Sequence, residues 1–253
     1  MRLSACIEWL FAEGGRPFPD RIRAAADAGL ERIEFWNLGD RNVDAIKSAL
    51  RETGVRVTGF VSEPAARLVD PATHDEFVAG VRRSAEMASR LGADGLIVVS
   101  GNTRPGVSRT EQRHAIASAL GRAAPVAAEH GVCLLLEPLN SLIDHEGYFL
   151  DSTPEALGIV RDVGHPSVRL LYDLYHSTVM GEDPAMVLTG AGDLVGHVHL
   201  ADVPGRHEPG TGGIDWPRQL AALRAAGYTG ALGLEYMPLR DTTSSLAFIR
   251  RLV

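Results

Sequence analysis

Short apolar runs alternate with helix-length segments along the whole 253-residue chain. Runs of this kind, separated by helices, predict a parallel sheet that is buried on both faces. The predicted strands are Leu3–Ile7, Arg32–Trp36, Val55–Val61, Gly95–Ser100, Val132–Leu136, Val168–Leu174, Gly196–Leu200 and Leu232–Tyr236. Eight such units in about 250 residues match a closed (β/α)8 barrel, so we expect residues 1–253 to form one α/β domain.

The segments between the runs carry helix patterns with recognisable start and stop signals. The predicted helices are Asp20–Ala28, Val43–Thr53, Asp75–Leu91, Arg109–Glu129, Pro154–Val163, Asp183–Leu188, Trp216–Ala226 and Thr243–Leu252. Thr153 and Asp215 are the predicted N-caps of the fifth and seventh helices. An open doubly wound sheet is the alternative, but Phe11–Arg16 lacks the glycine-rich phosphate turn that usually follows its first strand.

Charge and hydropathy limit the partners. The chain has 25 basic and 32 acidic residues and a net charge of −7, which argues against nucleic acid as a partner. The sequence lacks the run of roughly 18 apolar residues that a membrane span needs. Glu8 interrupts the apolar N-terminus, so we expect no signal peptide and a cytoplasmic location. The oligomeric state is left open, with a homo-oligomer as one alternative.

Four consecutive runs carry, near their C-terminal ends, a residue that can bind a metal: Glu137, Asp173, His199 and Glu235. Barrel strands project alternate residues inward, and active sites lie at the C-terminal mouth of the strands. We therefore expect the four side chains to converge. Three carboxylates with one imidazole suit Mn²⁺ best, with Mg²⁺ or Co²⁺ as alternatives, and suit a structural zinc less.

Each of these residues also has a simpler explanation. A lone carboxylate at the end of a strand most often caps a helix or forms a surface ion pair. Four at corresponding positions in apolar runs are harder to explain in that way, because burying carboxylates without partners is costly. A shared divalent cation removes that cost, and we predict that the set is a metal site.

Three further residues are candidates for contact with a substrate. Arg206 lies in the glycine-rich loop Val203–Gly213 after a ligand strand, where an arginine is well placed to bind a substrate oxygen. His176 follows Asp173 by three residues, and Trp36 ends the second strand. The alternatives are a flexible surface loop, a solvated histidine at the rim and a core tryptophan. His197 is predicted to be a hydrogen-bonded core residue beneath the metal.

The motifs Glu137–Asn140, Tyr172–His176, Gly196–Gly212 and Leu234–Tyr236 resemble those of the xylose isomerase-like barrel superfamily. The chain most resembles the hydroxypyruvate isomerase group, and ketose 3-epimerases and inosose isomerases and dehydratases are relatives of that group. The sequence departs from the group at Val61–Ala66, at His199, where glutamine is common, and at Gly212–Ile214.

The resemblance implies roles for individual residues. It implies that the four residues named above coordinate the metal, that His176 and Arg206 contact the substrate, and that Glu137 and Glu235 form the acid/base pair. One glutamate would remove a proton next to a carbonyl and the other would return it, through an enediolate. We therefore expect a metal-dependent isomerase or epimerase that acts on a small hydroxy-keto acid or ketose.

Three other functions remain as alternatives. A lyase of the inosose dehydratase type would use the same residues to expel water. A DNA-repair enzyme of the endonuclease IV group shares the barrel, but it uses a zinc cluster and a basic face. A non-catalytic sugar-binding barrel would not need an acid/base pair on the metal.

Overall fold

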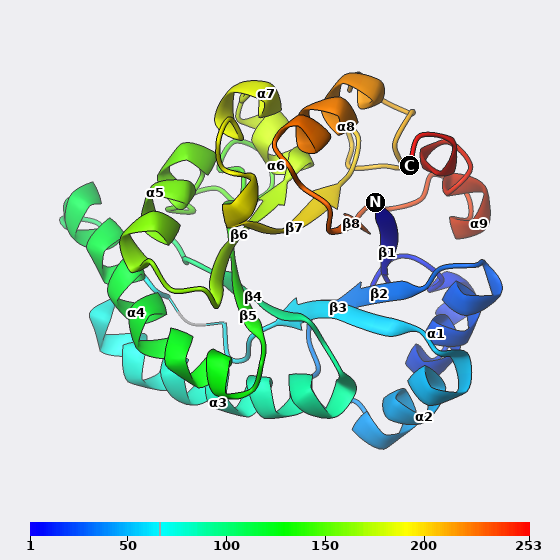
Figure 1. Ribbon diagram of the computed structural model, residues 1–253, viewed down its shortest axis with the longest axis horizontal. Coiled ribbons are helices and arrows are strands. Elements are labelled where there is room, and N and C mark those ends of the chain that lie inside the picture. The colour runs from blue at the N-terminus through cyan, green and yellow to red at the C-terminus, as the bar shows by residue number, and fades with distance from the viewer. Residues whose placement is uncertain (66) are drawn as a thin grey trace.

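The computed structural model describes residues 1–65 and 67–253, so Ala66, the last residue of the segment Val61–Ala66, lies outside the described chain. In the described residues, eight parallel strands pair in chain order and close into a barrel where β8 pairs with β1 (Figure 1). The strands are β1 (Arg2–Cys6), β2 (Arg32–Phe35), β3 (Arg56–Val61), β4 (Gly95–Val99), β5 (Cys133–Glu137), β6 (Val168–Asp173), β7 (Val195–Leu200) and β8 (Ala231–Leu234). The predicted (β/α)8 fold class is confirmed.

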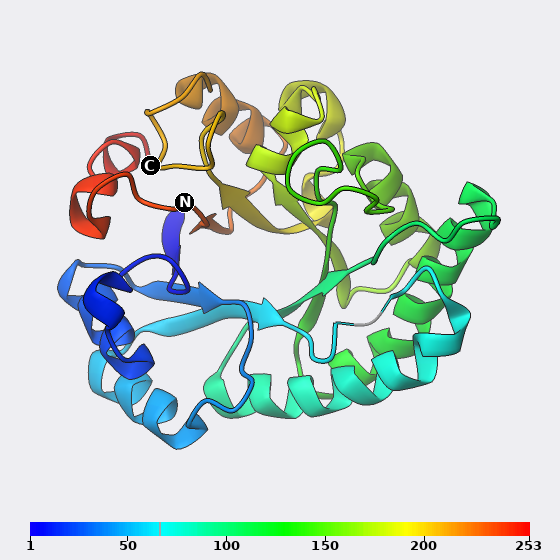
Figure 2. The same cartoon turned by 180° about the vertical axis from the view of Figure 1, so that it is seen from behind.

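The helices surround the ring of strands in both views (Figures 1 and 2). They are α1 (Phe18–Asp27), α2 (Val43–Thr53), α3 (His74–Leu91), α4 (Arg109–Glu129), α5 (Thr153–Val163), α6 (Leu174–Val179), α7 (Pro184–Val187), α8 (Trp216–Ala225) and α9 (Thr242–Ser245). Short 3-10 turns lie at η1 (Glu13–Gly15), η2 (Pro71–Thr73), η3 (Gly192–Leu194) and η4 (Ile249–Arg251). None of the described helices has both the length and the apolar character that crossing a membrane requires.

One predicted N-cap and one predicted helix are wrong. Ser152, not Thr153, caps α5, because its side chain accepts from the backbone N–H of Glu155. The predicted helix over Thr243–Leu252 is divided into α9 and η4. Ser245 Oγ donates to the carbonyl of Thr242 at 2.7 Å, and such bonds from serine to the backbone compete with helix continuation.

The strands also differ from prediction near the C-terminal mouth. Helix α6 follows β6 directly and was not predicted. The side chain of Asp173 caps it by accepting from the backbone N–H of His176 at 3.0 Å. The last strand ends at Leu234, one residue before Glu235. By contrast, Asp215 caps α8 as predicted, by accepting from the N–H of Arg218 at 3.1 Å.

The interior of the barrel has an apolar sector and a polar sector. The apolar sector is the buried cluster Ile97, Leu135 and Leu171 from β4, β5 and β6. The polar sector consists of Ser4, Glu34, Thr58 and His197 from β1, β2, β3 and β7. Thr58 Oγ1 donates to Ser4 Oγ at 3.0 Å, and Ser4 Oγ donates to Glu34 Oε2 at 3.1 Å. A buried polar network therefore lies in the barrel, on the side away from the apolar cluster.

Candidate metal and catalytic site

The four predicted ligands meet at the C-terminal mouth of the barrel. Each is buried, and one ligand atom from each lies within 4.8 Å of the others. They are Glu137, the last residue of β5, Asp173, the last residue of β6, His199 in β7, and Glu235 directly after β8. Convergence from four neighbouring strands was the central prediction from the sequence, and the geometry agrees with it.

The imidazole of His199 is the centre of this set. Its Nδ1 lies 3.2 Å from Glu137 Oε1, 3.3 Å from Glu235 Oε2 and 3.9 Å from Asp173 Oδ2. Asp173 contributes Oδ2 to this space because its Oδ1 is used as the cap of α6. Nδ1 and three carboxylates from different strands therefore face a common point.

The donor set fits a divalent cation. Three carboxylates are buried around one imidazole, and Arg206 is the cation that contacts them among the described residues. Burying several carboxylates together is costly unless positive charge is shared among them. Oxygen donors with one imidazole nitrogen are the ligands of hard or borderline divalent metals. The residues could thus hold such an ion.

The two glutamates have different electrostatic environments. Burial and the charges of Glu235 and Asp173 raise the pKa of Glu137 to about 7, against the opposing effect of His199. Burial also acts to raise the pKa of Glu235, but the positive charges of His199 and Arg206 outweigh it, and the pKa lies well below its usual value. One carboxyl group can therefore carry a proton near neutral pH while the other stays ionised.

Arg206 lies against the ligand set, as predicted for a substrate contact. Its Nη2 donates to Glu235 Oε2 at 2.6 Å and lies 3.7 Å from Asp173 Oδ2. The guanidinium stacks over Trp9 and Tyr175 at 5.3 and 5.0 Å from their ring centroids. Its side chain is only 13% exposed, so this part of the loop is packed into the site.

Asp202 holds the loop that carries Arg206. It is fully buried just after β7, and each donor to its carboxylate lies between Val203 and Trp216, the first residue of α8. Its oxygens accept from the N–H groups of Val203 (2.9 Å), Gly210 (2.7 Å), Thr211 (3.1 Å) and Ile214 (3.2 Å), and from the indole of Trp216 (2.9 Å). A Cβ at Gly212 would stand 2.5 Å from Asp202 Oδ1, so the close approach requires glycine.

His176 is buried, which excludes the solvated rim histidine considered as an alternative. The side-chain amide of Asn140 donates to its Nδ1 at 2.7 Å, so the ring proton belongs on Nε2, which lies 3.6 Å from Asp173 Oδ2. Burial lowers the pKa of His176 to about 4 despite the opposing charge of Asp173. The ring is therefore a neutral donor next to the ligand set.

Trp36 has two roles in the structure. It lines the cavity next to the ligands, and its indole Nε1 donates to Glu235 Oε1 at 2.6 Å. Its ring also packs edge-on against Trp9, with the centroids 4.9 Å apart. The prediction of an apolar wall described one of these roles and missed the hydrogen bond to Glu235.

A cavity of about 600 Å³ lies next to this site, because Trp36 and Arg206, which line it, both donate to Glu235. Most of its wall is aromatic or aliphatic, and the residues that form this wall include Trp9, Trp36, Ile143, Tyr175, Val203 and Met237. The polar lining includes Arg206, Asp144 and His145. An apolar wall with polar groups at a few fixed places is typical of small-molecule sites, because it excludes water while orienting the ligand.

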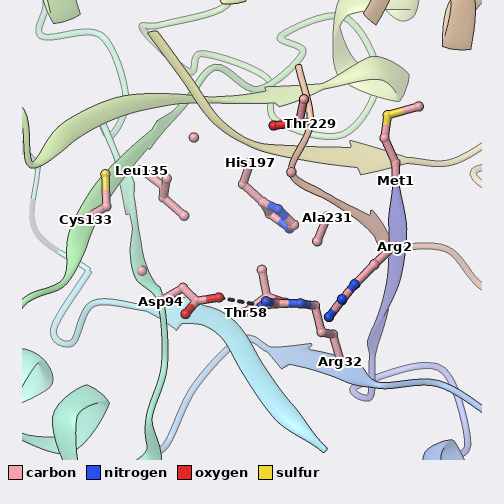
Figure 3. A pocket seen from close by; sticks show the side chains of 13 residues that line it. Met1, Arg2, Arg32, Thr58, Asp94, Cys133, Leu135, His197, Thr229 and Ala231 are labelled. Atoms are coloured by element: carbon pink, nitrogen blue, oxygen red, sulfur yellow. Dashed lines mark hydrogen bonds and ion pairs between the residues drawn. The ribbon is translucent and has the colours of Figure 1, made fainter. Parts of the chain in front are cut away.

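A second cavity, of about 470 Å³, lies at the opposite, N-terminal mouth (Figure 3). Arg32 extends across its floor and donates to Asp94 Oδ2 at 2.5 Å. His197 and Leu135 also line it. His197 Nε2 lies 2.7 Å from Glu34 Oε2, which agrees with its prediction as a hydrogen-bonded core histidine. Glu34 and His197 thus lie between this cavity and the ligand set.

Four residues of the site were not predicted from the sequence: Glu34, Asn140, Trp9 and Tyr175. A signal for Glu34 was present, because it is an acidic residue inside the apolar run of β2, as Glu137 and Glu235 are at the ends of theirs. The positions of Trp9 and Tyr175 depend on how Arg206 folds back over the barrel. That packing could not be read from spacing.

Comparison with known proteins agrees with the fold. A family model described as xylose isomerase-like TIM barrel matches residues 22–252. Hydroxypyruvate isomerase of Escherichia coli is 30% identical, over 98% of this chain and 98% of its own length. 2-Oxo-tetronate isomerase of Cupriavidus necator is 28% identical, over 98% of this chain and 97% of its own length. A Brucella melitensis structure named AP endonuclease, family 2, has 31% identity and a TM-score of 0.90, covering 99% of this chain and 98% of that one.

These relatives confirm the resemblance inferred from the motifs. The two curated relatives are named isomerases and match nearly the whole chain, which makes the enzyme class that of an isomerase. The matched residues 22–252 include the four converging side chains and the loop of Arg206. The chain belongs to the xylose isomerase-like TIM barrel family.

Proposed function

We propose that this isomerase moves a proton at the carbon next to the carbonyl of a small hydroxy-keto acid or ketose. The observation that carries the proposal is the pairing of Glu137 and Glu235 across His199, next to a cavity whose lining residues Trp36 and Arg206 both donate to Glu235. Two carboxyl groups with opposite pKa shifts at one site are a common arrangement of an acid and a base.

We also propose that Glu137, Asp173, His199 and Glu235 hold a divalent cation, with Mn²⁺ favoured over Mg²⁺ and Co²⁺. Three carboxylates and one imidazole support that choice. A bound cation would polarise the substrate carbonyl and stabilise the negative charge that develops on its oxygen.

The proton transfers are assigned to the chain's own carboxyl groups. Glu235, kept ionised by Arg206, removes the proton from the carbon next to the carbonyl, and the substrate becomes an enediolate. The hydroxyl proton of the enediolate passes to the former carbonyl oxygen, and Glu137 supplies a proton to the former carbonyl carbon, where a new C–H bond forms. The two carboxyl groups then return to their starting protonation states by exchange with water.

Binding and orientation are assigned to the residues around this pair. The Nε2–H of His176 and the guanidinium of Arg206 are placed to donate to substrate oxygens, and Trp36 forms the wall beside Glu235. Holding the reacting C–H beside a carboxylate can lower the barrier by several kcal/mol.

Epimerisation of a ketose is the second candidate. The cavity of about 600 Å³ has room for a substrate larger than a three-carbon acid. The candidate ligand from β7 is His199. The ketose 3-epimerases that this sequence resembles also carry histidine at that position. In an epimerisation the proton would return to the same carbon from the opposite face.

A screen in D₂O tests the proposal. The protein, loaded with Mn²⁺, is incubated with hydroxypyruvate, a four-carbon 2-oxo acid and C4–C6 ketoses, and the products are followed by NMR after removal of the metal. We expect deuterium at one carbon of one substrate and an unchanged product skeleton. Deuterium on the neighbouring carbon indicates isomerisation, and inversion at the same carbon indicates epimerisation. Loss of water would identify a lyase, and no exchange in any substrate would contradict the proposal.

A further inference from the structure

Glu34 lies beneath the ligand set, on a strand that supplies none of its members. It is 2% exposed, and its two carboxylate oxygens have different neighbours. Oε2 accepts from Ser4 Oγ at 3.1 Å and lies 2.7 Å from His197 Nε2. Oε1 faces His199 Nε2 at 3.3 Å. One oxygen is thus held by the polar sector, and the other faces the imidazole of the ligand set.

The imidazole of His199 lies between the carboxylates of the ligand set and the carboxylate of Glu34. Its Nδ1 faces Glu137 and Glu235, and its Nε2 faces Glu34. In the described residues, Glu34 Oε1 and His199 Nε2 are both fully buried, have no hydrogen-bond partner and lie 3.3 Å apart. A proton on Nε2 satisfies both atoms at once, whereas a proton on Nδ1 alone leaves a buried carboxylate oxygen facing a lone pair.

Gly233 makes the approach of Glu34 to His199 sterically feasible. A Cβ at this position would stand 2.3 Å from Glu34 Oε1, 2.6 Å from His199 Cδ2 and 2.8 Å from His197 Nε2. These distances are too short for a real contact, so any side chain on this residue of β8 would push the carboxylate and the rings apart. The space is kept for the contact between Glu34 and His199.

We propose that Glu34 is a positioning residue that fixes the ring orientation and tautomer of His199, with the proton on Nε2 and the lone pair of Nδ1 directed to a divalent cation. The proposal rests on the proposed function, because it assumes that His199 is a ligand. His197 and Ser4 hold Glu34 in place from the other side.

The physical basis is the partner that a metal-binding histidine needs. A histidine that binds a metal through one nitrogen commonly donates the other N–H to a carboxylate, which fixes the tautomer and makes the imidazole a stronger ligand. Loss of such a partner typically weakens metal binding by about 10–100-fold. Glu34 would be the contribution of the first half of the barrel to the metal site.

A second metal ion among Glu34, His197 and His199 is the competing interpretation, because one ligand atom from each also lies within 4.8 Å of the others. The 2.7 Å separation of Glu34 Oε2 and His197 Nε2 is that of a charge-assisted hydrogen bond. That distance favours a proton, not a cation, between these two atoms.

Metal titration tests the role of Glu34 without using activity. Chelator-treated wild type, Glu34→Gln and Glu63→Gln are titrated with Mn²⁺, and free Mn²⁺ is measured by electron paramagnetic resonance. Glu63 is a matched control because it accepts from the backbone N–H groups of Leu38 and Gly39, away from the ligands. We expect one Mn²⁺ per chain, a 10–100-fold weaker Kd in Glu34→Gln and a Kd within about twofold of wild type in Glu63→Gln.

A second measurement does not need the Glu34→Gln variant, in case that variant does not fold. Nitrogen NMR of ¹⁵N-histidine protein loaded with diamagnetic Mg²⁺ reports which nitrogen of His199 carries the proton, and we expect Nε2. Assignment uses a His199→Gln spectrum.

Several results would overturn the proposal: equal Mn²⁺ affinity in Glu34→Gln and wild type, a proton on Nδ1 of His199, no Mn²⁺ bound at all, or two ions per chain of which Glu34→Gln loses one. The last result would make Glu34 a ligand. If Glu34→Gln weakens Mn²⁺ as expected but wild type exchanges no proton in any keto substrate, the positioning role stands and the proposed function fails.

Discussion

The two halves of the barrel contribute differently to the site. The ligand half, β5 to β8 with the segments that follow them, supplies the four converging side chains, His176 and Arg206. The support half, β1 to β4 with the segments that follow them, supplies Glu34 and Trp36, which contact members of that set through hydrogen-bonding groups.

The longest described helices lie in the support half and the shortest in the ligand half, while α1, α2, α5 and α8 have 10 or 11 residues each. In the support half, α3 and α4 have 18 and 21 residues, whereas α6, α7 and α9 in the ligand half have 6, 4 and 4. Long connections after β5 and β7 replace helix there and carry Asn140 and Arg206. A closed barrel thus tolerates loss of helix on the side that carries function, because its strands stay paired with both neighbours.

The largest effect is expected for Glu235→Gln in the ligand half. Glutamine keeps the shape of the side chain but cannot accept a proton from carbon, so kcat should fall at least about 10³-fold. Steady-state kinetics with the substrate found in D₂O, together with circular dichroism to check the fold, measures this. Activity near wild type would remove Glu235 from the mechanism.

A smaller effect is expected for Asp202→Asn, which acts through Arg206. In the variant, an NH₂ group replaces one of the carboxylate oxygens that accept from backbone N–H groups in the wild type. The loop should therefore loosen, and kcat/KM should fall by about 10²-fold. Asp215→Asn is the matched control, because Asp215 caps α8 outside the cavity, and it should retain activity within about threefold. Equal losses in the two variants would argue for a general loss of stability.

A pH effect on stability is expected from His176. Its pKa of about 4 in the folded chain lies below the usual value of 6.5, so the unfolded chain binds the proton first as the pH falls. Stability contributed by the neutral ring is present above about pH 6.5 and is lost toward pH 4, by about 2 kcal/mol between pH 7 and pH 5.

Urea unfolding of wild type and His176→Gln at pH 7 and pH 5, with EDTA present, measures that loss. The variant should show the smaller difference between the two pH values. An identical pH dependence in both proteins would contradict the burial-driven shift.

The smallest of the four effects is expected in the support half, for Trp36→Phe. The ring is kept, but the hydrogen bond from the indole to Glu235 is removed, and a bond to a charged group of this kind corresponds to about a tenfold loss in kcat/KM. Trp9→Phe keeps the packing against Arg206 and is the control. A loss in Trp36→Phe as large as that in Glu235→Gln would break the distinction between ligand and support halves.

Much of the site could be predicted because its residues occupy corresponding positions in successive strands. Glu137, Asp173, His199 and Glu235 each lie near the C-terminal end of an apolar run, and parallel strands in a barrel bring such positions to one mouth. The cap of α8 at Asp215 was readable for a similar reason, since capping is local. The helix predicted over Thr243–Leu252 is divided because the hydroxyls of Ser244 and Ser245 bond to preceding carbonyls, a competition that periodicity does not reveal.

By itself, the sequence determined the barrel, the order of its strands and the four residues that converge, because these depend on periods and positions within single strands. The tertiary structure alone decided the contacts across the barrel: Glu34 beneath His199, Trp36 on Glu235, and Arg206 folded between Trp9 and Tyr175. Those contacts join residues far apart in the chain, and closure of the strands and packing of the loops set their distances.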